Sequence, residues 1–173
     1  MKVAFLDRDG VINVDHGYVH CVDRFEFLPG VIKALQLLVA NGFSLIVVTN
    51  QSGIGRGYYS EADYQKLTHW YVSELAKHKV NILDVFHCPH SPEENCDCRK
   101  PKSGLFDQAC EKYAINMEKS LMVGDKLSDI EAAISAGVAF RYLVGSVKNA
   151  EKIDCSSVLT CLNLMQSVNA HIN

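Results

Sequence analysis

The feature that most constrains this chain is a regular alternation of two kinds of segment. Short apolar runs rich in Val, Ile and Leu alternate with longer amphipathic stretches of helix length. This alternation is typical of β-α-β units, which build a mostly parallel sheet with helices on its faces. A chain of 173 residues with 48% hydrophobic content can bury one core but not two comfortably, so we expect a single α/β domain over residues 1–173.

The segment boundaries follow from the same pattern. The predicted strands are the short apolar runs Val3–Asp7, Phe43–Thr49, Asp84–Cys88, Ser120–Gly124 and Ala139–Val144. The predicted helices are the amphipathic stretches Val31–Ala40, Glu61–Lys77, Gly104–Tyr113 and Ser128–Ala136. Gly42 and Gly137 are placed to end two of these helices, because glycine readily adopts the left-handed conformation of a helix C-cap. The tail, over about residues 156–168, predicts a short amphipathic helix.

Composition limits where the protein acts and what it binds. The apolar run after Lys2 reaches Asp7 too soon for a signal peptide, and no run approaches the roughly 20 residues that cross a bilayer. We therefore expect a cytoplasmic protein whose seven cysteines stay reduced. A net charge of −3 gives no general attraction to nucleic acid or an anionic membrane. We expect a monomer that acts on a small molecule, without a nucleic-acid or membrane partner.

Polar residues follow three of the predicted strands, at the edge where parallel sheets bind ligands. The first strand ends in "FLDRDG", where Asp7 and Asp9 are two residues apart and would point to the same side of an extended chain. The second ends in "VVTNQSG" and the fourth in "MVGDKLSDI". Each stretch alone could be an ordinary turn or helix cap. Three such ends in one β-α-β chain favour a shared site.

This order of motifs resembles the haloacid dehalogenase superfamily of phosphotransferases, over about residues 2–144. The closer resemblance is to the group of heptose bisphosphate and histidinol-phosphate phosphatases, through "FLDRDGVINVDHGYVH", "VVTNQSGIGRG", "CPH", "CDCRKP" and "MVGDK". It implies a Rossmann-like fold and a phosphatase that forms an aspartyl-phosphate intermediate. The stretch between Asp9 and Gly30 is too short for the separate cap domain that many relatives insert there, so we expect loops to enclose the substrate.

The resemblance assigns catalytic roles to particular residues. Asp7 would be the nucleophile toward phosphorus, and Asp9 would act first as general acid and then as general base. Thr49 and Lys100 would stabilise the transferring phosphoryl group. Mg²⁺ would be held by Asp7, Asp125 and the backbone carbonyl of Asp9, because this hard cation prefers oxygen ligands.

A second metal site is predicted from "CPHSPEENCDCRK", residues 88–100. Within the loop 88–98, Cys88, His90, Cys96 and Cys98 form a Cys₃His set, which is suited to a structural Zn²⁺. Unliganded thiols are the alternative reading. Because Cys98 directly precedes the Arg99-Lys100 pair, the zinc would hold these two side chains in place and take no part in the chemistry.

The substrate is predicted from the cations and loops that would surround it. A sugar bisphosphate carries a distal phosphate, which a planar guanidinium such as Arg99 can bind through two parallel hydrogen bonds, with Arg56 as a possible helper. The other expected substrate contacts come from two stretches of chain and two lysines: Asp15, His16, Gly17, Tyr18, Thr49, Asn50, Gln51, Ser52, Lys100 and Lys126. The resemblance implies removal of the 7-phosphate of D-glycero-D-manno-heptose 1,7-bisphosphate, in the synthesis of nucleotide-activated heptose.

The sequence also allows other substrates and another function. Histidinol phosphate carries a cationic amine that would favour a carboxylate such as Asp15, and the short stretch between His90 and Cys96 is closer to that branch. A phosphatase acting on DNA ends would need a basic groove to bind the DNA backbone, and the net charge of −3 does not indicate one. A zinc-bearing interaction module with a silent catalytic core is a further alternative, against which the intact Asp7, Asp9 and Lys100 speak.

Overall fold

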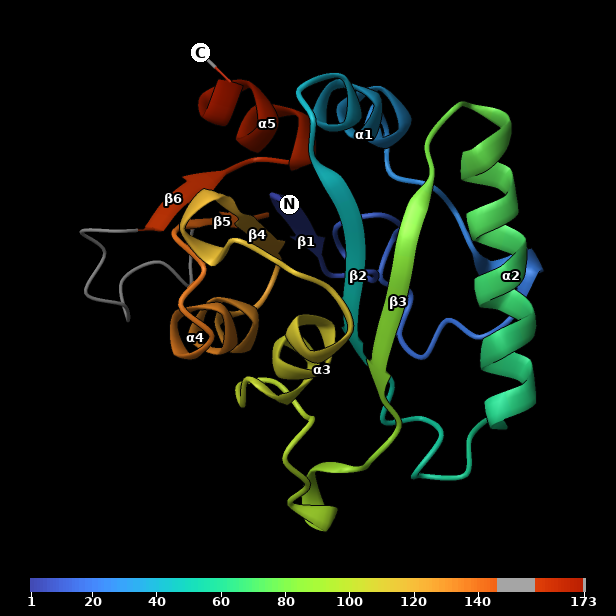
Figure 1. Cartoon of the computed structure of the whole chain (residues 1–173). Helices are drawn as coiled ribbons and strands as arrows, with labels where there is room; N and C mark the ends of the chain where they lie inside the picture. Colours follow the sequence, from blue (N-terminus) through green and yellow to red (C-terminus); the bar gives the residue numbers. More distant parts are fainter. Residues whose placement is uncertain (146–157, 173) are drawn as a thin grey trace.

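The computed structural model describes residues 1–145 and 158–172, and its centre is one parallel sheet (Figure 1). The strands are β1 (Val3–Leu6), β2 (Ser44–Asn50), β3 (Ile82–Cys88), β4 (Leu121–Gly124), β5 (Phe140–Val144) and β6 (Val158–Cys161). Their order is β3-β2-β1-β4-β5-β6, and every neighbouring pair is parallel. The predicted α/β class is confirmed.

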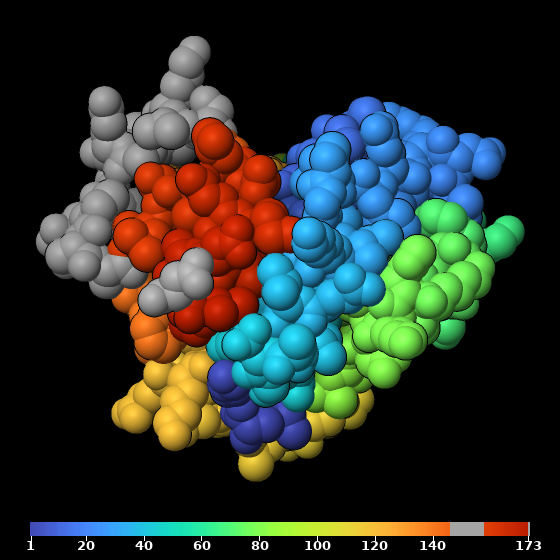
Figure 2. Space-filling model, turned by 90° about the horizontal axis from the view of Figure 1, so that it is seen from above, coloured from blue at the N-terminus to red at the C-terminus, as the bar shows by residue number. Residues whose placement is uncertain are grey.

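Helices cover both faces of this sheet. They are α1 (Val31–Ala40), α2 (Glu61–Lys77), α3 (Gly104–Lys112), α4 (Leu127–Ser135) and α5 (Leu164–Ile172), with short 3₁₀ turns at η1 (Val22–Arg24), η2 (Pro92–Glu94) and η3 (Met117–Lys119). Side chains alternate along a strand, so β1 sends Ala4 and Leu6 into the core beneath α1, α2 and α5. Val3 and Phe5 enter the opposite core, beneath α3 and α4. Figure 2 shows the red C-terminal segment packed directly against the blue segment that contains α1.

The helix and strand boundaries agree closely with the sequence patterns. Gly42 and Gly137 take φ values of 78° and 76°, as expected for left-handed helix stops. The helix α2 begins with a capping box, in which Ser60 and Asp63 each accept a hydrogen bond from the other's backbone N–H. Between β1 and α1 the structure has a loop with η1 and no separate cap domain. None of the described helices is long and apolar enough to span a membrane.

The tail differs from the prediction. Residues 158–161, expected to be helical, form β6 and pair with β5 in parallel register from Arg141↔Val158 to Val144↔Cys161. Pairing with β5 satisfies their backbone groups and buries Val158 and Cys161, which outweighs the weak helical spacing of the apolar residues. A helix does follow, but it is α5 and begins at Leu164. Residues 156 and 157 of the predicted segment lie outside the described residues.

Candidate active site

The sheet order brings the predicted strand ends together, because β1 lies between β2 and β4. Asp7 follows β1, Asp125 follows β4, and Asp129 lies in the first turn of α4. Their carboxylate oxygens lie within 4.8 Å of one another. Asp129 was missed by the sequence reasoning. The sequence does contain a sign of its role. Asp129 is four residues after Asp125, and one helical turn at the start of α4 brings its side chain back toward the end of β4.

A fully buried lysine joins two of these carboxylates. Lys100 Nζ lies 3.1 Å from Asp7 Oδ1 and 2.6 Å from Asp129 Oδ1, and it donates to the carbonyl of Val48 at 2.8 Å. Burial alone would lower the pKa of Lys100, but Asp129 and Asp7 raise it above its usual value. The ammonium group therefore stays charged, with Asp7 and Asp129 as its ion-pair partners and the Val48 carbonyl as its hydrogen-bond acceptor.

Two carboxylate oxygens at this cluster are buried without a hydrogen bond from any described residue. They are Asp125 Oδ1 and Asp7 Oδ1, the latter in ion-pair contact with Lys100. Burial, followed by the neighbouring charge of Asp7, raises the pKa of Asp125 to about 7. Buried anionic oxygens that lack donors fit a hard divalent cation, so the donor set suits Mg²⁺.

Two glycines allow the backbone to approach these carboxylates. A Cβ on Gly10 would lie 2.4 Å from Asp125 Oδ2, and the φ of Gly10 is +84°, which also favours glycine. A Cβ on Gly124 would lie 2.3 Å from the Cβ of Asp129. The glycines of "DRDG" and "VGDK" therefore allow the two strand ends to converge.

The Asp9 side chain lies outside the carboxylate cluster and is held by a different set of groups. Arg8 is fully buried, and its Nη2 contacts Asp9 Oδ2 at 2.8 Å. Asn13 Nδ2 donates to Asp9 Oδ1 at 2.9 Å, and Gln51 Nε2 donates to Asp9 Oδ2 at 3.1 Å. Whether the backbone carbonyl of Asp9 binds the metal stays a prediction.

A pocket of about 500 Å³ opens beside Asp9 and Lys100. It is lined by Asp9, Asp15, Gly17, Tyr18, Asn50, Gln51, Ser52, Tyr59, Arg99, Lys100, Pro101, Lys126 and Ser128. Most of the residues predicted to contact substrate are thus brought together. Across the pocket, Lys126 Nζ and Asp15 Oδ2 form an ion pair at 3.2 Å, which joins the loop after β1 to the start of α4.

Three predicted contacts do not line this pocket. His16 is exposed, and its Nε2 lies 3.5 Å from Glu26, so its ring is placed in a separate surface hollow. Arg56 instead pairs with Glu93 at 3.5 Å. Thr49 is buried, and its Oγ1 accepts a hydrogen bond from Gln51.

Two further predicted contacts line the pocket, but their side-chain amides are hydrogen-bonded to other groups of the protein. The Asn50 side chain accepts from the backbone N–H of Lys100 and donates to its carbonyl, both at 3.1 Å. It therefore fixes the backbone of Lys100. Gln51 uses both Nε2 hydrogens on Asp9 and Thr49, so it has no free donor for a sugar hydroxyl.

The four predicted zinc ligands converge after β3. Cys96 Sγ lies 3.5 Å from the sulfur atoms of both Cys88 and Cys98, and His90 Nδ1 lies 3.6 Å from Cys88 Sγ and 3.2 Å from Cys98 Sγ. The cysteines are free thiols. These separations are close to the edges of a tetrahedron around an ion with Zn–S bonds of about 2.3 Å. The donor set and its geometry fit Zn²⁺.

Comparisons with known proteins place this geometry in context. The sequence pattern of the haloacid dehalogenase-like hydrolases matches residues 2–137. The chain is 50% identical over 154 residues to D-glycero-beta-D-manno-heptose-1,7-bisphosphate 7-phosphatase of Haemophilus ducreyi, covering 85% of each chain. It is 48% identical over 151 residues to the D-glycero-alpha-D-manno-heptose-1,7-bisphosphate 7-phosphatase of Photorhabdus laumondii, covering 83% of this chain and 82% of the relative.

A solved structure is similar over nearly the whole length. It is a D,D-heptose 1,7-bisphosphate phosphatase from B. bronchiseptica complexed with magnesium and phosphate. The TM-score is 0.90 at 30% sequence identity, with 99% of this chain and 98% of the other chain covered.

Proposed function

Because this chain belongs to the haloacid dehalogenase-like hydrolase family, we propose that it is a Mg²⁺-dependent phosphatase that removes the 7-phosphate of D-glycero-D-manno-heptose 1,7-bisphosphate. The observation that carries the proposal is the convergence of Asp7, Asp125 and Asp129 around Lys100, beside a polar pocket lined by Arg99. Two relatives near 50% identity with this named activity support the substrate. They differ in the named anomer, so the proposal covers both.

The first half-reaction transfers the phosphoryl group to the protein. A carboxylate oxygen of Asp7 attacks phosphorus, the bond from phosphorus to the sugar oxygen breaks, and Asp9 donates its proton to that oxygen. Asp7, Asp125 and Asp129 would hold Mg²⁺, which supplies charge neutralisation of the phosphoryl oxygens when bound. Lys100 keeps Asp7 in place and adds a second positive charge at the same point.

The second half-reaction restores the protein. Water attacks phosphorus of the aspartyl phosphate, and Asp9 accepts a proton from that water. The bond between phosphorus and the Asp7 oxygen breaks, so the Asp7 carboxylate is restored and inorganic phosphate leaves. One carboxyl group therefore serves both steps. Hydrogen bonds from Arg8, Asn13 and Gln51 hold this carboxyl group outside the cluster of three aspartates, where it would not bind the cation.

The distal phosphate would bind at the far side of the pocket. Arg99 lines it, and its one hydrogen bond to a described residue is a long contact from Nη1 to the carbonyl of His90 at 3.5 Å, which leaves most of its guanidinium donors for a ligand. Lys126 also lines the pocket, but its charge is paired with Asp15, so Arg99 would be the main cation for that phosphate. That pairing weakens the case for histidinol phosphate, because the carboxylate that would bind its amine is already neutralised.

The zinc loop would hold the Arg99-Lys100 arm. Cys98 is adjacent to Arg99 in sequence and is part of the Cys₃His cluster, so a bound Zn²⁺ would fix the chain directly before both cations. We also propose that the protein acts as a monomer in the cytoplasm on this small substrate, without nucleic acid or membrane.

A phosphate-release assay tests the proposal. The substrates are both anomers of heptose 1,7-bisphosphate, histidinol phosphate and a 3′-phosphorylated oligonucleotide, each with Mg²⁺ and with excess chelator. We expect Mg²⁺-dependent release from at least one heptose anomer, with kcat/KM at least about a hundredfold above the other two classes. Comparable or higher kcat/KM on histidinol phosphate would refute the proposed substrate.

A further inference from the structure

Asp9 is linked to the neighbouring strand by a short chain of hydrogen bonds. Gln51 follows β2, and its Nε2 donates to Asp9 Oδ2 at 3.1 Å and to Thr49 Oγ1 at 3.0 Å. On the other side of the amide, the hydroxyl of Tyr59 donates to Gln51 Oε1 at 2.7 Å. Gln51 and Tyr59 are both buried.

The Tyr59 hydroxyl determines which way the Gln51 amide faces. With Tyr59 donating to Oε1, the NH₂ group faces Asp9, whose carboxylate accepts hydrogen bonds when it is ionised. In the flipped orientation, Oε1 would face that carboxylate and two acceptors would repel. Burial raises the pKa of Tyr59 to about 12, so its hydroxyl remains a donor at physiological pH.

The other groups that hold Asp9 come from its own loop. Arg8 and Asn13 are within four residues of Asp9, and both contact its carboxylate. The link through Gln51 and Tyr59 differs, because it comes from the loop after β2 and ties the Asp9 side chain to the body of the sheet. Such a link would fix the direction in which the Asp9 carboxyl group points, and this direction matters because the group must reach the leaving oxygen of the sugar.

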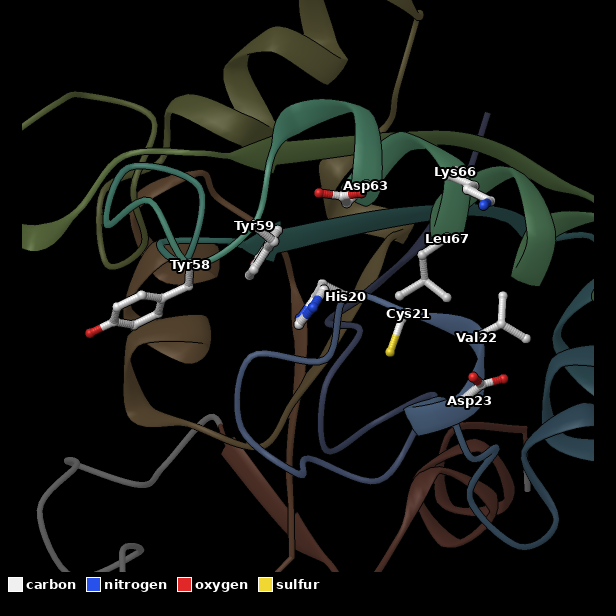
Figure 3. A pocket seen from close by; sticks show the side chains of 9 residues that line it. All are labelled: His20, Cys21, Val22, Asp23, Tyr58, Tyr59, Asp63, Lys66 and Leu67. Carbon is white, nitrogen blue, oxygen red and sulfur yellow. The ribbon is translucent and has the colours of Figure 1, made fainter.

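Tyr59 also packs against a second ring, that of His20. It forms part of the boundary between the substrate pocket and a second hollow of about 420 Å³, whose wall includes His20, Tyr58 and Tyr59. Figure 3 shows the His20 ring beside that of Tyr59, and the two rings stack with centroids 4.9 Å apart and an interplanar angle of 6°. The stacked ring keeps the hydroxyl pointed at Gln51.

We propose that Gln51 and Tyr59 are positioning residues for the general acid, holding the Asp9 carboxyl group where it can protonate the leaving sugar oxygen. The inference rests on the proposed phosphatase activity. Neither residue would exchange a proton with substrate. Replacing them should slow the step in which the P–O bond to the sugar breaks. The loss of rate should be larger for a basic leaving oxygen, which must be protonated, than for one that leaves as a stable anion.

The principal variant is Tyr59→Phe, which keeps the stacked ring and removes only the hydroxyl. Its matched control is Tyr58→Phe, which removes an exposed hydroxyl from the adjacent residue. With heptose 1,7-bisphosphate, we expect Tyr59→Phe to lower kcat about tenfold, with KM within about twofold, because the Gln51 amide that orients the acid is no longer held by the Tyr59 hydroxyl. The control should match the parent.

A second substrate separates positioning of the acid from general damage. The nitrophenolate of p-nitrophenyl phosphate leaves as a stable anion and needs little protonation. In single-turnover reactions with enzyme in excess, release of nitrophenolate by Tyr59→Phe should stay within about twofold of the parent. An equal loss on both substrates would overturn the inference, and so would an unchanged kcat on the bisphosphate.

A double variant tests whether Tyr59 acts through Gln51. Gln51→Met removes the amide while keeping a side chain of similar length, and it should lower kcat at least as much as Tyr59→Phe. The combined variant should be no slower than Gln51→Met alone, whereas additive losses would contradict the proposed chain of contacts. Thermal unfolding of each variant checks that it is folded. A parent protein without activity on the bisphosphate would refute the proposed function, which separates that failure from a failure of this inference.

Discussion

Replacing Asp125 with asparagine should change how the stability of the metal-free protein depends on pH. The pKa of Asp125 is raised from 3.8 to about 7 by burial and by the charge of Asp7. Between these two pH values the folded protein binds a proton that the unfolded chain has released. Raising the pH therefore destabilises the fold, and the stabilising contribution of the protonated group is lost as the pH passes through about 7.

The size of the effect follows from the pKa difference. The shift from 3.8 to about 7 corresponds to about 4 kcal/mol as an upper value, at 1.36 kcal/mol for each pKa unit. The Asp125 side chain keeps 20% of its surface exposed, so some of this is screened and about 2–4 kcal/mol is expected. The raised pKa of Asp129 acts in the same direction.

The assay is urea unfolding from pH 4 to 8 in excess chelator, for the parent and for Asp125→Asn. The difference between the two curves reports the titration of Asp125 together with its coupling to Asp7, because the remaining titrating groups are common to both proteins. We expect the parent to lose about 2–4 kcal/mol relative to the variant across this range. Saturating Mg²⁺ should restore the parent, by about 2.7 kcal/mol at a hundred times the Kd, and leave the variant nearly unchanged. A difference curve that is flat, or that rises with pH, would refute the argument.

Three further predictions concern catalysis and the two metals. Asp9→Asn should turn over slowly and accumulate phosphate on Asp7, since hydrolysis of the intermediate lacks its base; mass spectrometry of the quenched protein would detect it, and fast turnover without it would contradict the dual role. The purified protein should contain about one Zn²⁺ per chain by elemental analysis, and Cys96→Ser should lose the metal together with activity on mono- and bisphosphates alike. Arg99→Ala should lose roughly 30- to 1,000-fold in kcat/KM on the bisphosphate while a small monophosphate ester is hydrolysed nearly as before; equal losses would show that Arg99 serves the transferring phosphoryl group.

The sheet was predictable because its information is local. Each strand is a short apolar run, and glycines such as Gly42 and Gly137 mark where helices stop, so element type and order could be read directly from the sequence. The tail was not predictable in this way. Whether residues 158–161 form a helix or a strand depends on the exposed edge of β5, which lies elsewhere in the chain and offers backbone partners.

The site was predicted at the level of residues but not of contacts. Asp7 and Asp125 stand in motifs at strand ends that the sheet order brings together, and Lys100 follows the Cys₃His loop after β3. The roles of Gln51 and Asp129 depend on where individual side-chain atoms point. Gln51 looked like a sugar ligand because it follows β2, yet its amide is occupied by Asp9, Thr49 and Tyr59.

The proposed mechanism requires that a heptose 1,7-bisphosphate phosphorylates Asp7 in the presence of Mg²⁺. The most direct measurement mixes the parent protein with this substrate, quenches with acid within the first turnover, and maps phosphorylated peptides by mass spectrometry. We expect one phosphate on the peptide that contains Asp7, and none in Asp7→Asn, which should be folded but inactive. Release of inorganic phosphate at the parental rate by Asp7→Asn, or a phosphate carried by a different residue, would contradict it.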